Sequence, residues 1–369
     1  MNRIEIQSRT EEPGRSKLLV AAVNEEGLAL STGQFVLTES YYCGNPVKTM
    51  LAGGIATPVE HRRGGNVRKM FAYMHRAACE EGVALSLLHP FSFSYYNQFG
   101  YERVADHLIL RCPTRTLDFL PRTCRLIPFE EEMLPEVLQV YHRFARGRNL
   151  LLKRSNEKHF VGKNRNTYVY FEGKEAVAYV TFTTAKTLHI NNYRDTLLTV
   201  CEMAYASPQG LDAILSFLRM FEGEFEEIEF RDVNLYSELD LLLRHYTHTS
   251  YTRLPDLAAR ILNTETLLRA NLYPQAPGAF TLRVLDDLPT VAGTFAVSYG
   301  AGACRVQRLE ESAKAHVTLT APALLRIMYG SDPLDAHTLQ YLKGCSASGN
   351  AEALLAAFPK RPCGVFEHF

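Results

Sequence analysis

Five apolar residues between positions 67 and 78 fall on one face of a helix. They recur at i, i+3, i+4, i+7 and i+11: Val67, Met70, Phe71, Met74 and Ala78. This spacing is typical of an amphipathic α-helix with one buried stripe. Gly82 follows the last of them, and glycine tolerates the left-handed conformation that commonly ends a helix. The pattern therefore predicts a helix that begins after the glycine pair at 64–65 and ends before Gly82.

Runs of apolar and β-branched residues on both sides of this helix predict strands. The runs that precede it are residues 18–23, 34–42 and 48–57, and those that follow it are residues 83–88 and 107–111. Pro113 and Pro121 then mark the exit from this block, because proline neither donates a ladder hydrogen bond nor continues a strand. A strand, a helix and a short buried strand in this order indicate a mixed α/β block up to about residue 118.

Two further blocks have the same mixed character. In the middle block we expect helices at 130–145 and 208–220, with strands at 123–128, 167–171, 176–184, 187–192, 196–204 and 226–230. In the last block we expect helices at 257–268, 321–329, 334–342 and 350–358, with strands at 280–285, 291–298, 304–309 and 316–319. The chain of 369 residues is too long for one ordinary core. We predict an α/β (α+β) fold with three domains, at residues 1–118, 119–256 and 257–369.

A basic, glycine-rich turn lies between the third strand and the helix. It reads Arg62, Arg63, Gly64, Gly65 and Asn66. The start of a helix offers unpaired backbone N–H groups and a partial positive charge, and glycines let an anion approach the main chain. The turn therefore predicts a pyrophosphate site. Taken alone, the same residues are also compatible with a solvated basic turn.

Composition narrows the classes of function. Forty basic and forty acidic residues cancel, which argues against general binding to nucleic acid or to a membrane surface. The eight cysteines include no C-x-x-C pair, so the sequence predicts no zinc ribbon, no redox motif and no metal site. No apolar run reaches the length of a membrane span or the core of a signal peptide. We expect a cytoplasmic protein with reduced thiols.

The order of two motifs adds a family resemblance. Arg62-x-x-Gly65-x-Val67 follows a strand, and Tyr96-x-x-Phe99-Gly100-Tyr101 comes about thirty residues later. This arrangement resembles the acetyl-CoA site of the GNAT acetyltransferases. The resemblance implies acetyl-CoA as co-substrate and no metal. The implied cofactor-binding positions are Ile55, Ala56, Thr57, Arg62, Arg63, Gly64, Gly65, Asn66, Val67 and Arg68. Val67 departs from the glycine or alanine that is usual there.

Three features are similar to the Eis-like (enhanced intracellular survival) branch of that family. Leu88-His89 precedes the Tyr96 turn, the chain extends far beyond one GNAT module, and its last residue is the aromatic Phe369. The resemblance implies a second, degenerate GNAT-like domain without cofactor and a last domain like the sterol carrier protein. It also implies Tyr96 as general acid, the Phe369 carboxylate as general base, and His89 and His368 in the substrate pocket. Members of the branch assemble as homo-oligomers, often hexamers.

The residues themselves leave some of these roles open. Tyr96 has a reference pKa near ~10 and stays protonated at neutral pH, but it also fits an aromatic core. His89 is a rival base to Phe369, because imidazole titrates near neutrality. Only about 17 residues precede the strand at Leu18, whereas a GNAT module opens with a strand and two helices, so we expect an open acceptor pocket.

These observations lead to two hypotheses on function. The first is an acetyl-CoA-dependent N-acetyltransferase whose acceptor is an aminoglycoside-like amine, a polyamine or a protein lysine. The second is a non-catalytic acyl-CoA-binding or scaffold protein. Release of free thiol from acetyl-CoA in the presence of amines distinguishes the two.

Overall fold

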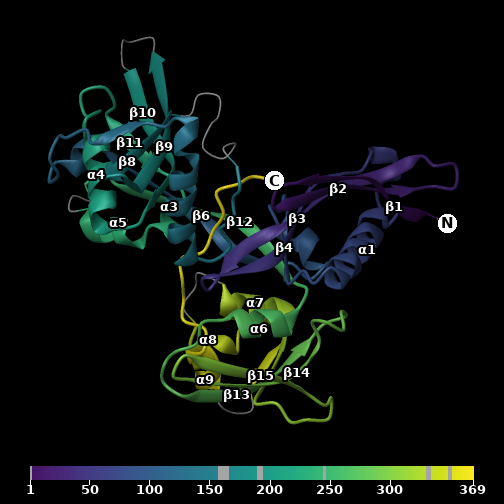
Figure 1. Cartoon of the computed structure of the whole chain (residues 1–369). Coiled ribbons are helices and arrows are strands. Elements are labelled where there is room, and N and C mark those ends of the chain that lie inside the picture. The colour runs from purple at the N-terminus through teal and green to yellow at the C-terminus, as the bar shows by residue number, and fades with distance from the viewer. Residues whose placement is uncertain (1, 157–165, 189–193, 244–246, 330–333, 348–350) are drawn as a thin grey trace. The chain divides into compact units, whose positions relative to one another are not determined.

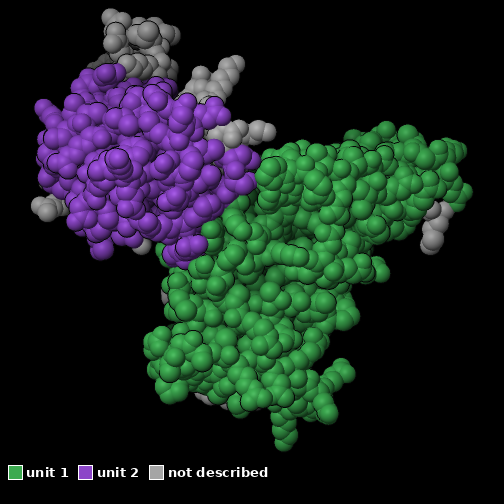
Figure 2. Space-filling view, viewed as in Figure 1, with its two compact units in different colours: residues 1–105, 149–153, 256–369 green, residues 106–148, 154–255 purple. Residues whose placement is uncertain are grey.

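The computed structural model describes residues 2–156, 166–188, 194–243, 247–329, 334–347 and 351–369 (Figure 1). The chain divides into two units, which Figure 2 colours separately. Unit 1 comprises residues 1–105, 149–153 and 256–369, and unit 2 comprises residues 106–148 and 154–255. None of the helices in these described ranges is long and apolar enough to cross a membrane.

Unit 1 opens with an antiparallel meander. Its strands are β1 (Arg3–Glu12), β2 (Arg15–Val23), β3 (Ala29–Tyr42) and β4 (Asn45–Ala56), each paired with the next. Strands β2, β3 and β4 confirm the predicted runs. We did not predict β1, because it is an edge strand whose residues are nearly all polar and exposed or half-buried. Such a strand lacks the apolar alternation that marks a half-buried strand in a sequence.

The connection between β1 and β2 is a tight turn. Only residues 13 and 14 separate the two strands, and Gly14 has φ 74°. No helix therefore lies between β1 and β2.

Helix α1 (Asn66–Glu80) connects β4 to β5 (Leu85–Leu88), and both elements confirm the prediction. Met70, Phe71, Met74 and Ala78 of the apolar stripe are buried, with Val67 half-buried. Burial of each large side chain contributes roughly 1.5–3 kcal/mol. Strand β5 lies parallel to β4, which is the pairing that a crossover helix permits.

The predicted helix at 257–268 is wrong in its first half. Strand β12 (Ser250–Ile261) occupies those positions and pairs with β5, and helix α6 (Thr264–Ala270) begins only after Asn263. Residues 257–261 are buried. The segment reads Leu-Ala-Ala-Arg-Ile and is buried on both faces, so it lacks the alternation of a half-buried strand, and a sequence pattern does not separate it from a buried helix.

The rest of unit 1 is a second sheet with helices. The sheet has the order β15-β14-β13-β16-β17, with β13 (Gly278–Leu285), β14 (Gly293–Gly300), β15 (Ala303–Leu309), β16 (Val317–Thr320) and β17 (Cys345–Ala347). Helix α6 packs against both β15 and β4. Helix α7 (Ala321–Met328) confirms its prediction, and α9 (Ala351–Ala356) lies within the predicted 350–358. Of the helix predicted at 334–342, only α8 (Ala336–Leu339) is helical.

Unit 2 repeats the plan of a meander followed by a crossover helix. Strands β7 (Leu126–Pro128), β8 (Asn166–Glu172), β9 (Glu175–Leu188) and β10 (Arg194–Tyr205) are antiparallel neighbours. Helix α4 (Pro208–Arg219) then leads to β11 (Glu227–Phe230), which is parallel to β10 and antiparallel to β6 (Glu102–Pro113). Helix α3 (Leu134–Arg146) and the short α5 (Ser237–Leu242) complete the unit. Residues 189–192 of the strand predicted at 187–192 lie outside the described residues.

Helix α4 differs from α1 at its N-terminus. The side chain of Ser207 accepts a hydrogen bond from the Gly210 N–H, and Pro208 has no N–H to offer. The first turn of α4 is therefore already satisfied within the chain, which agrees with the absence of an arginine/glycine turn before it.

Gly100 is expected to be a position where alanine strongly destabilises the fold. Its φ is 81°, and an added Cβ would overlap the guanidinium of Arg260, which is buried and paired with Asp286. We expect Gly100→Ala to cost about 2–4 kcal/mol, through backbone strain plus displacement of a buried ion pair. Thermal unfolding followed by circular dichroism measures the shift. Gly173→Ala is the matched control, because Gly173 has φ 64° with open space around it. Equal shifts in both variants would contradict the role of Arg260.

Candidate active site

Strand β4 carries a bulge at its carboxyl end. Thr32 pairs with Ala56 and Gln34 with Gly53, so two residues of β4 lie opposite one residue of β3. Gly54, inside the bulge, has φ 58°. A bulge of this kind bends its strand and re-aims the residues that follow. The bulge therefore leaves residues 54 and 55 without a partner on β3, and pairing resumes at Ala56.

The same end of β4 continues past its parallel neighbour. The register of the two strands runs from Thr49 with Leu85 to Leu51 with Leu87. Residues 52–56 of β4 extend beyond that last pair. Backbone groups of residues 55–57 are thus placed to hold an extended chain as a strand would.

The basic glycine turn leads directly into helix α1. Gly65 is the N-cap residue with φ 72°, and no side chain caps the helix. Arg63 also has a positive φ, of 64°. A Cβ on Gly65 would meet nothing within 4 Å. The first N–H groups of α1 are therefore accessible to an anion, and the residues present fit a pyrophosphate group.

A cavity of about 680 Å³, the first cavity, lies at this helix start. Nine of the ten predicted cofactor-binding residues line it: Ile55, Thr57, Arg62, Arg63, Gly64, Gly65, Asn66, Val67 and Arg68. Ala56, the tenth, does not line it. The opposite wall includes Phe91, Tyr95 and Phe99 from the turn around α2 (Phe93–Asn97). A lining that combines arginines and glycines with aromatic side chains suits a partly anionic ligand that also has apolar parts.

Two tyrosines of α2 have different surroundings. Tyr96 is buried, 5% exposed, with its ring against Phe71, Phe91 and Tyr101. Burial raises the pKa of Tyr96 to about 12, and the neighbouring Tyr95 adds to this effect. Tyr95 lines the first cavity.

The end of the chain lies against the bulged part of β4. A Cβ added to Gly53 would come within 2.6 Å of the Phe369 carbonyl carbon and 2.8 Å of its oxygen. The Phe369 ring lies 4.7 Å, and the His368 ring 5.0 Å, from that of His89, centroid to centroid. The structure thus brings together the three residues that we singled out at His89 and the C-terminus.

His89 is fixed through both ring nitrogens. Its Nδ1 lies 3.1 Å from Oδ1 of Asp256, and its Nε2 lies 3.1 Å from the carbonyl oxygen of Glu367. Both ring nitrogens of His89 therefore have an oxygen partner within hydrogen-bond distance. These contacts anchor the chain end at His89 and leave neither nitrogen without a neighbour.

Sequence reasoning missed several residues of this region. Asp256 is brought to His89 only by the long-range pairing of β12 with β5. Ser31, whose hydroxyl lies 2.9 Å from that of Thr57, follows from no local pattern. Gly53 and Gly54 did carry a signal, because glycine inside a strand often marks a bulge or a close approach of backbones.

Gly65→Ala tests whether the helix start binds the co-substrate. We expect KM for acetyl-CoA to rise about tenfold or more, because a Cβ would project into the space that the phosphates need and would strain the left-handed backbone. Steady-state kinetics over a range of acetyl-CoA concentrations measures this. The matched control is Gly27→Ala, since Gly27 has φ 84° and open space around it but lies in another loop. An unchanged KM in Gly65→Ala would contradict the assignment of the pyrophosphate site.

Comparison with known proteins agrees with this geometry. Residues 5–104 match the acetyltransferase (GNAT) domain family. They include the meander, the bulge, the glycine turn, α1 and α2. The match confirms the enzyme class expected from the sequence, a GNAT N-acetyltransferase, and this class implies an acyl-CoA co-substrate. A search of curated proteins gave no match.

Solved structures share the fold over nearly the whole chain. A GCN5-related N-acetyltransferase from Anabaena variabilis aligns with a TM-score of 0.81 at 18% identity, covering 95% of this chain and 89% of that one. A GCN5-related N-acetyltransferase from Kribbella flavida aligns with a TM-score of 0.77 at 16% identity, covering 95% of this chain and 87% of that one. Eis1 from Mycobacterium abscessus aligns with a TM-score of 0.76 at 16% identity, covering 95% of this chain and 91% of that one. At such low identities the TM-scores show a common fold and no more: an α+β architecture with a GNAT domain and a second sheet.

Proposed function

We propose that this chain, which carries a GNAT N-acetyltransferase domain, transfers the acetyl group of acetyl-CoA to an amine. The acceptor classes that we propose are aminoglycoside-like amines, polyamines and protein lysines. The observation that carries the proposal is the uncapped start of α1, where Gly65 leaves open space beside a bulged β4. An anion-binding helix start and an exposed strand end are the two features that an acyl-CoA needs.

The first cavity provides the groups that would hold the co-substrate. Arg62, Arg63 and the N–H groups at the start of α1 would hold the pyrophosphate. The main chain of Ile55, Ala56 and Thr57 would pair with the pantetheine arm, and its N–H groups would also stabilise the oxyanion of the tetrahedral intermediate. Acyl-CoA supplies an activated thioester; the protein orients it and moves the protons.

Tyr96 is the proposed general acid. Its pKa of about 12 keeps the hydroxyl protonated throughout the neutral range. Against a thiol of reference pKa ~8.5, donation from such a phenol is uphill by roughly 5 kcal/mol. The same apolar surroundings raise the pKa of a leaving thiolate, so the gap narrows within the site. Tyr96 therefore donates its proton to sulfur as the C–S bond breaks.

The carboxylate of Phe369 is the proposed general base. The rival, His89, has both ring nitrogens engaged, which supports the carboxylate. A free carboxylate has a reference pKa of about 3.5, which is too low for an effective base unless burial raises it. Phe369 is half-buried and lies against Gly53. His89 and His368 would border the acceptor.

For the rest of the chain we propose the domain arrangement of the Eis-like acetyltransferases. We assign residues 1–118 to the catalytic GNAT domain, 119–256 to a degenerate GNAT-like domain and 257–369 to a domain like the sterol carrier protein. The meander, bulge and crossover of unit 2 support the second assignment: β10 also has a register shift, between Val200 and Glu202. Assembly into a homo-oligomer such as a hexamer, and a cytoplasmic location, are parts of the same proposal.

A thiol-release assay with a mixed panel of amines tests the function. We expect saturable release of CoA that depends on an amine, with an acetylated product in the mass spectrum. Saturable binding of acetyl-CoA without release for any amine would instead favour a non-catalytic acyl-CoA-binding protein. That second function is a specific alternative because a two-residue turn joins β1 to β2 here. In the GNAT family, two helices follow the first strand and form one wall of the acceptor site.

A further inference from the structure

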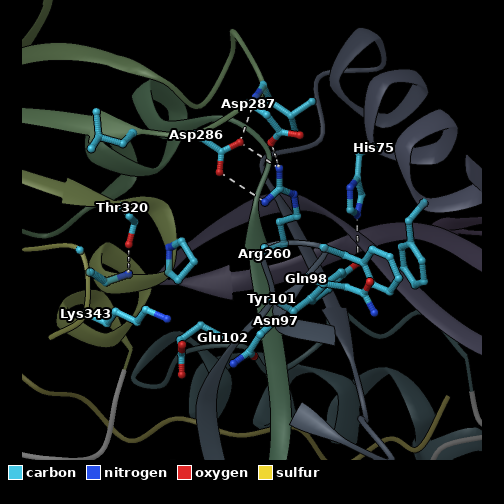
Figure 3. A pocket seen from close by; sticks show the side chains of 18 of the residues that line it. His75, Asn97, Gln98, Tyr101, Glu102, Arg260, Asp286, Asp287, Thr320 and Lys343 are labelled. Atoms are coloured by element: carbon cyan, nitrogen blue, oxygen red, sulfur yellow. Dashed lines mark hydrogen bonds and ion pairs between the residues drawn. The ribbon is translucent and has the colours of Figure 1, made fainter. Parts of the chain in front are cut away.

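Unit 1 contains another cavity, the second cavity, which the proposed reaction does not use. Its volume is about 1190 Å³. One wall is formed by α1 and residues 97–102, and the other by residues 285–289, the start of α7 and residues 341–344 (Figure 3). The cavity therefore lies between the GNAT-type sheet and the second sheet of the same unit. Its volume is slightly above the range of about 300–1,000 Å³ that is typical of small-molecule sites, so it has room for a small molecule.

Two carboxylates of this cavity share one guanidinium. Arg260 is 3% exposed, and its Nη2 lies 2.9 Å from Oδ1 of Asp286 and 2.7 Å from Oδ1 of Asp287. Figure 3 shows the guanidinium between the two carboxylates. Asp286 is buried with Arg260, whereas the Asp287 side chain is 85% exposed. The cluster therefore keeps one excess negative charge, and the net charge of the cavity depends on the other side chains.

Those other side chains are mainly cationic. Arg76 from α1, Arg326 from α7 and Lys343 from the turn before β17 line the cavity, and Arg68 lies at its edge. Glu102 is the one carboxylate among the lining residues that is not paired with Arg260. Among the described residues, no ion pair engages Lys343. Cations from three separate elements around one space favour an anion, and phosphate is the group that arginine and lysine bind best together.

The second cavity also has apolar surface at its mouth. Leu285 is 48% exposed and Tyr341 is 74% exposed, and both line the cavity. Exposed large apolar side chains beside a cavity mark a site for an apolar partner, and a tyrosine ring suits stacking against a flat ring. Asn97 and Gln98 add amide groups to the opposite wall, and amides can pair with the edge of a base.

The two cavities share a wall. Arg68, Gln98 and Phe99 line both. The Nη2 of Arg68 donates to Oε1 of Gln98 at 2.5 Å, and its guanidinium lies 5.9 Å from the Phe99 ring centroid. These three side chains are therefore accessible from both cavities.

We propose that the second cavity binds a phosphorylated nucleoside, with its phosphate at Lys343 and Arg76 and its base beside Tyr341 and Leu285. This gives the C-terminal sheet a direct part in ligand binding. The same chemistry has two sources: the 3′-phosphoadenosine end of acyl-CoA, reaching past Arg68, or a separate phosphorylated metabolite. The assignment to acyl-CoA rests on the proposed function. The assignment of a nucleoside site does not depend on it.

Isothermal titration of the full chain with adenosine 3′,5′-bisphosphate tests the site. We expect saturable binding, weakened about tenfold or more in Lys343→Glu and in Arg76→Glu, because each loses a charge-assisted hydrogen bond. Both residues are exposed, and thermal melts check that the variants fold. Lys314→Glu, at an exposed position outside both cavities, is the matched control and should bind as the wild type does.

Two further measurements identify the source. If acetyl-CoA displaces the bisphosphate, and Lys343→Glu raises KM for acetyl-CoA but not for acetyl-3′-dephospho-CoA, the site holds the nucleotide end of the co-substrate. If bisphosphate and acetyl-CoA bind together, the site takes a separate ligand. No binding of the bisphosphate, or binding that neither substitution weakens, would overturn the proposal. Amine-dependent thiol release in the wild type is scored independently, so failure of this site leaves the proposed function standing.

Discussion

Replacing Tyr96 by phenylalanine is expected to lower acetyl transfer by two orders of magnitude or more while acetyl-CoA binding stays unchanged. The substitution removes one hydroxyl and leaves the buried ring against Phe71 and Tyr101. A general acid typically contributes about 10²–10⁴ in rate, so the loss should be seen in kcat. Turnover with saturating acetyl-CoA and amine measures it, and titration of the variant with acetyl-CoA checks binding.

Tyr95→Phe is the control that the structure itself supplies. Tyr95 lies next in the chain and lines the first cavity, whereas Tyr96 is 5% exposed. If the family motif assigns the acid correctly, Tyr95→Phe keeps most of the activity. If Tyr95→Phe is the inactive variant and Tyr96→Phe is active, the proton donor is Tyr95 and the role of Tyr96 is packing.

The pH dependence gives a second readout of the same assignment. Burial disfavours the phenolate, so the pKa of Tyr96 is raised to about 12 and the donor form persists as the pH rises through the neutral and mildly alkaline range. The rate at pH 8–10 should therefore show no fall from loss of the acid. A fall with an apparent pKa near 9 that disappears in Tyr96→Phe would contradict this role.

The sequence predicted the elements whose signals are local. The stripe from Val67 to Ala78 needed only helical spacing, and the basic glycine turn before it needed only the chemistry of a helix start. Nine of the ten predicted cofactor positions accordingly line one cavity. The fold class was predicted in the same way, because strand-like runs and segments with helical spacing follow one another along the chain.

The features that the sequence did not predict depend on long-range pairing or on exposure. Strand β1 is polar because it is an exposed edge, so no apolar alternation marks it. Residues 257–261 form a central strand because β5 pairs with them, and a buried run of that length is compatible with a helix as well. The contact between Asp256 and His89, and the cavity that both Arg76 and Lys343 line, bring together residues more than 160 positions apart.

The end of the chain gives the other prediction with a large expected effect. Deleting Phe369 should lower acetyl transfer by two or more orders of magnitude and leave acetyl-CoA binding intact, because it removes the proposed base from Gly53. Deletion alone does not separate the carboxylate from the ring, since both are lost. Two variants separate them. Phe369→Leu keeps the carboxylate, and a glycine added after Phe369 keeps the ring but moves the carboxylate by about 3.8 Å.

We expect the glycine extension to be as inactive as the deletion and Phe369→Leu to lose less than about tenfold, because proton transfer requires the base within hydrogen-bond reach of the amine. Gly53→Ala acts on the same contact from the opposite side, since its Cβ would lie 2.6 Å from the Phe369 carbonyl carbon, and it should lower kcat more than it changes KM for acetyl-CoA. An active extended variant would show that the proton leaves the amine by a route other than the Phe369 carboxylate.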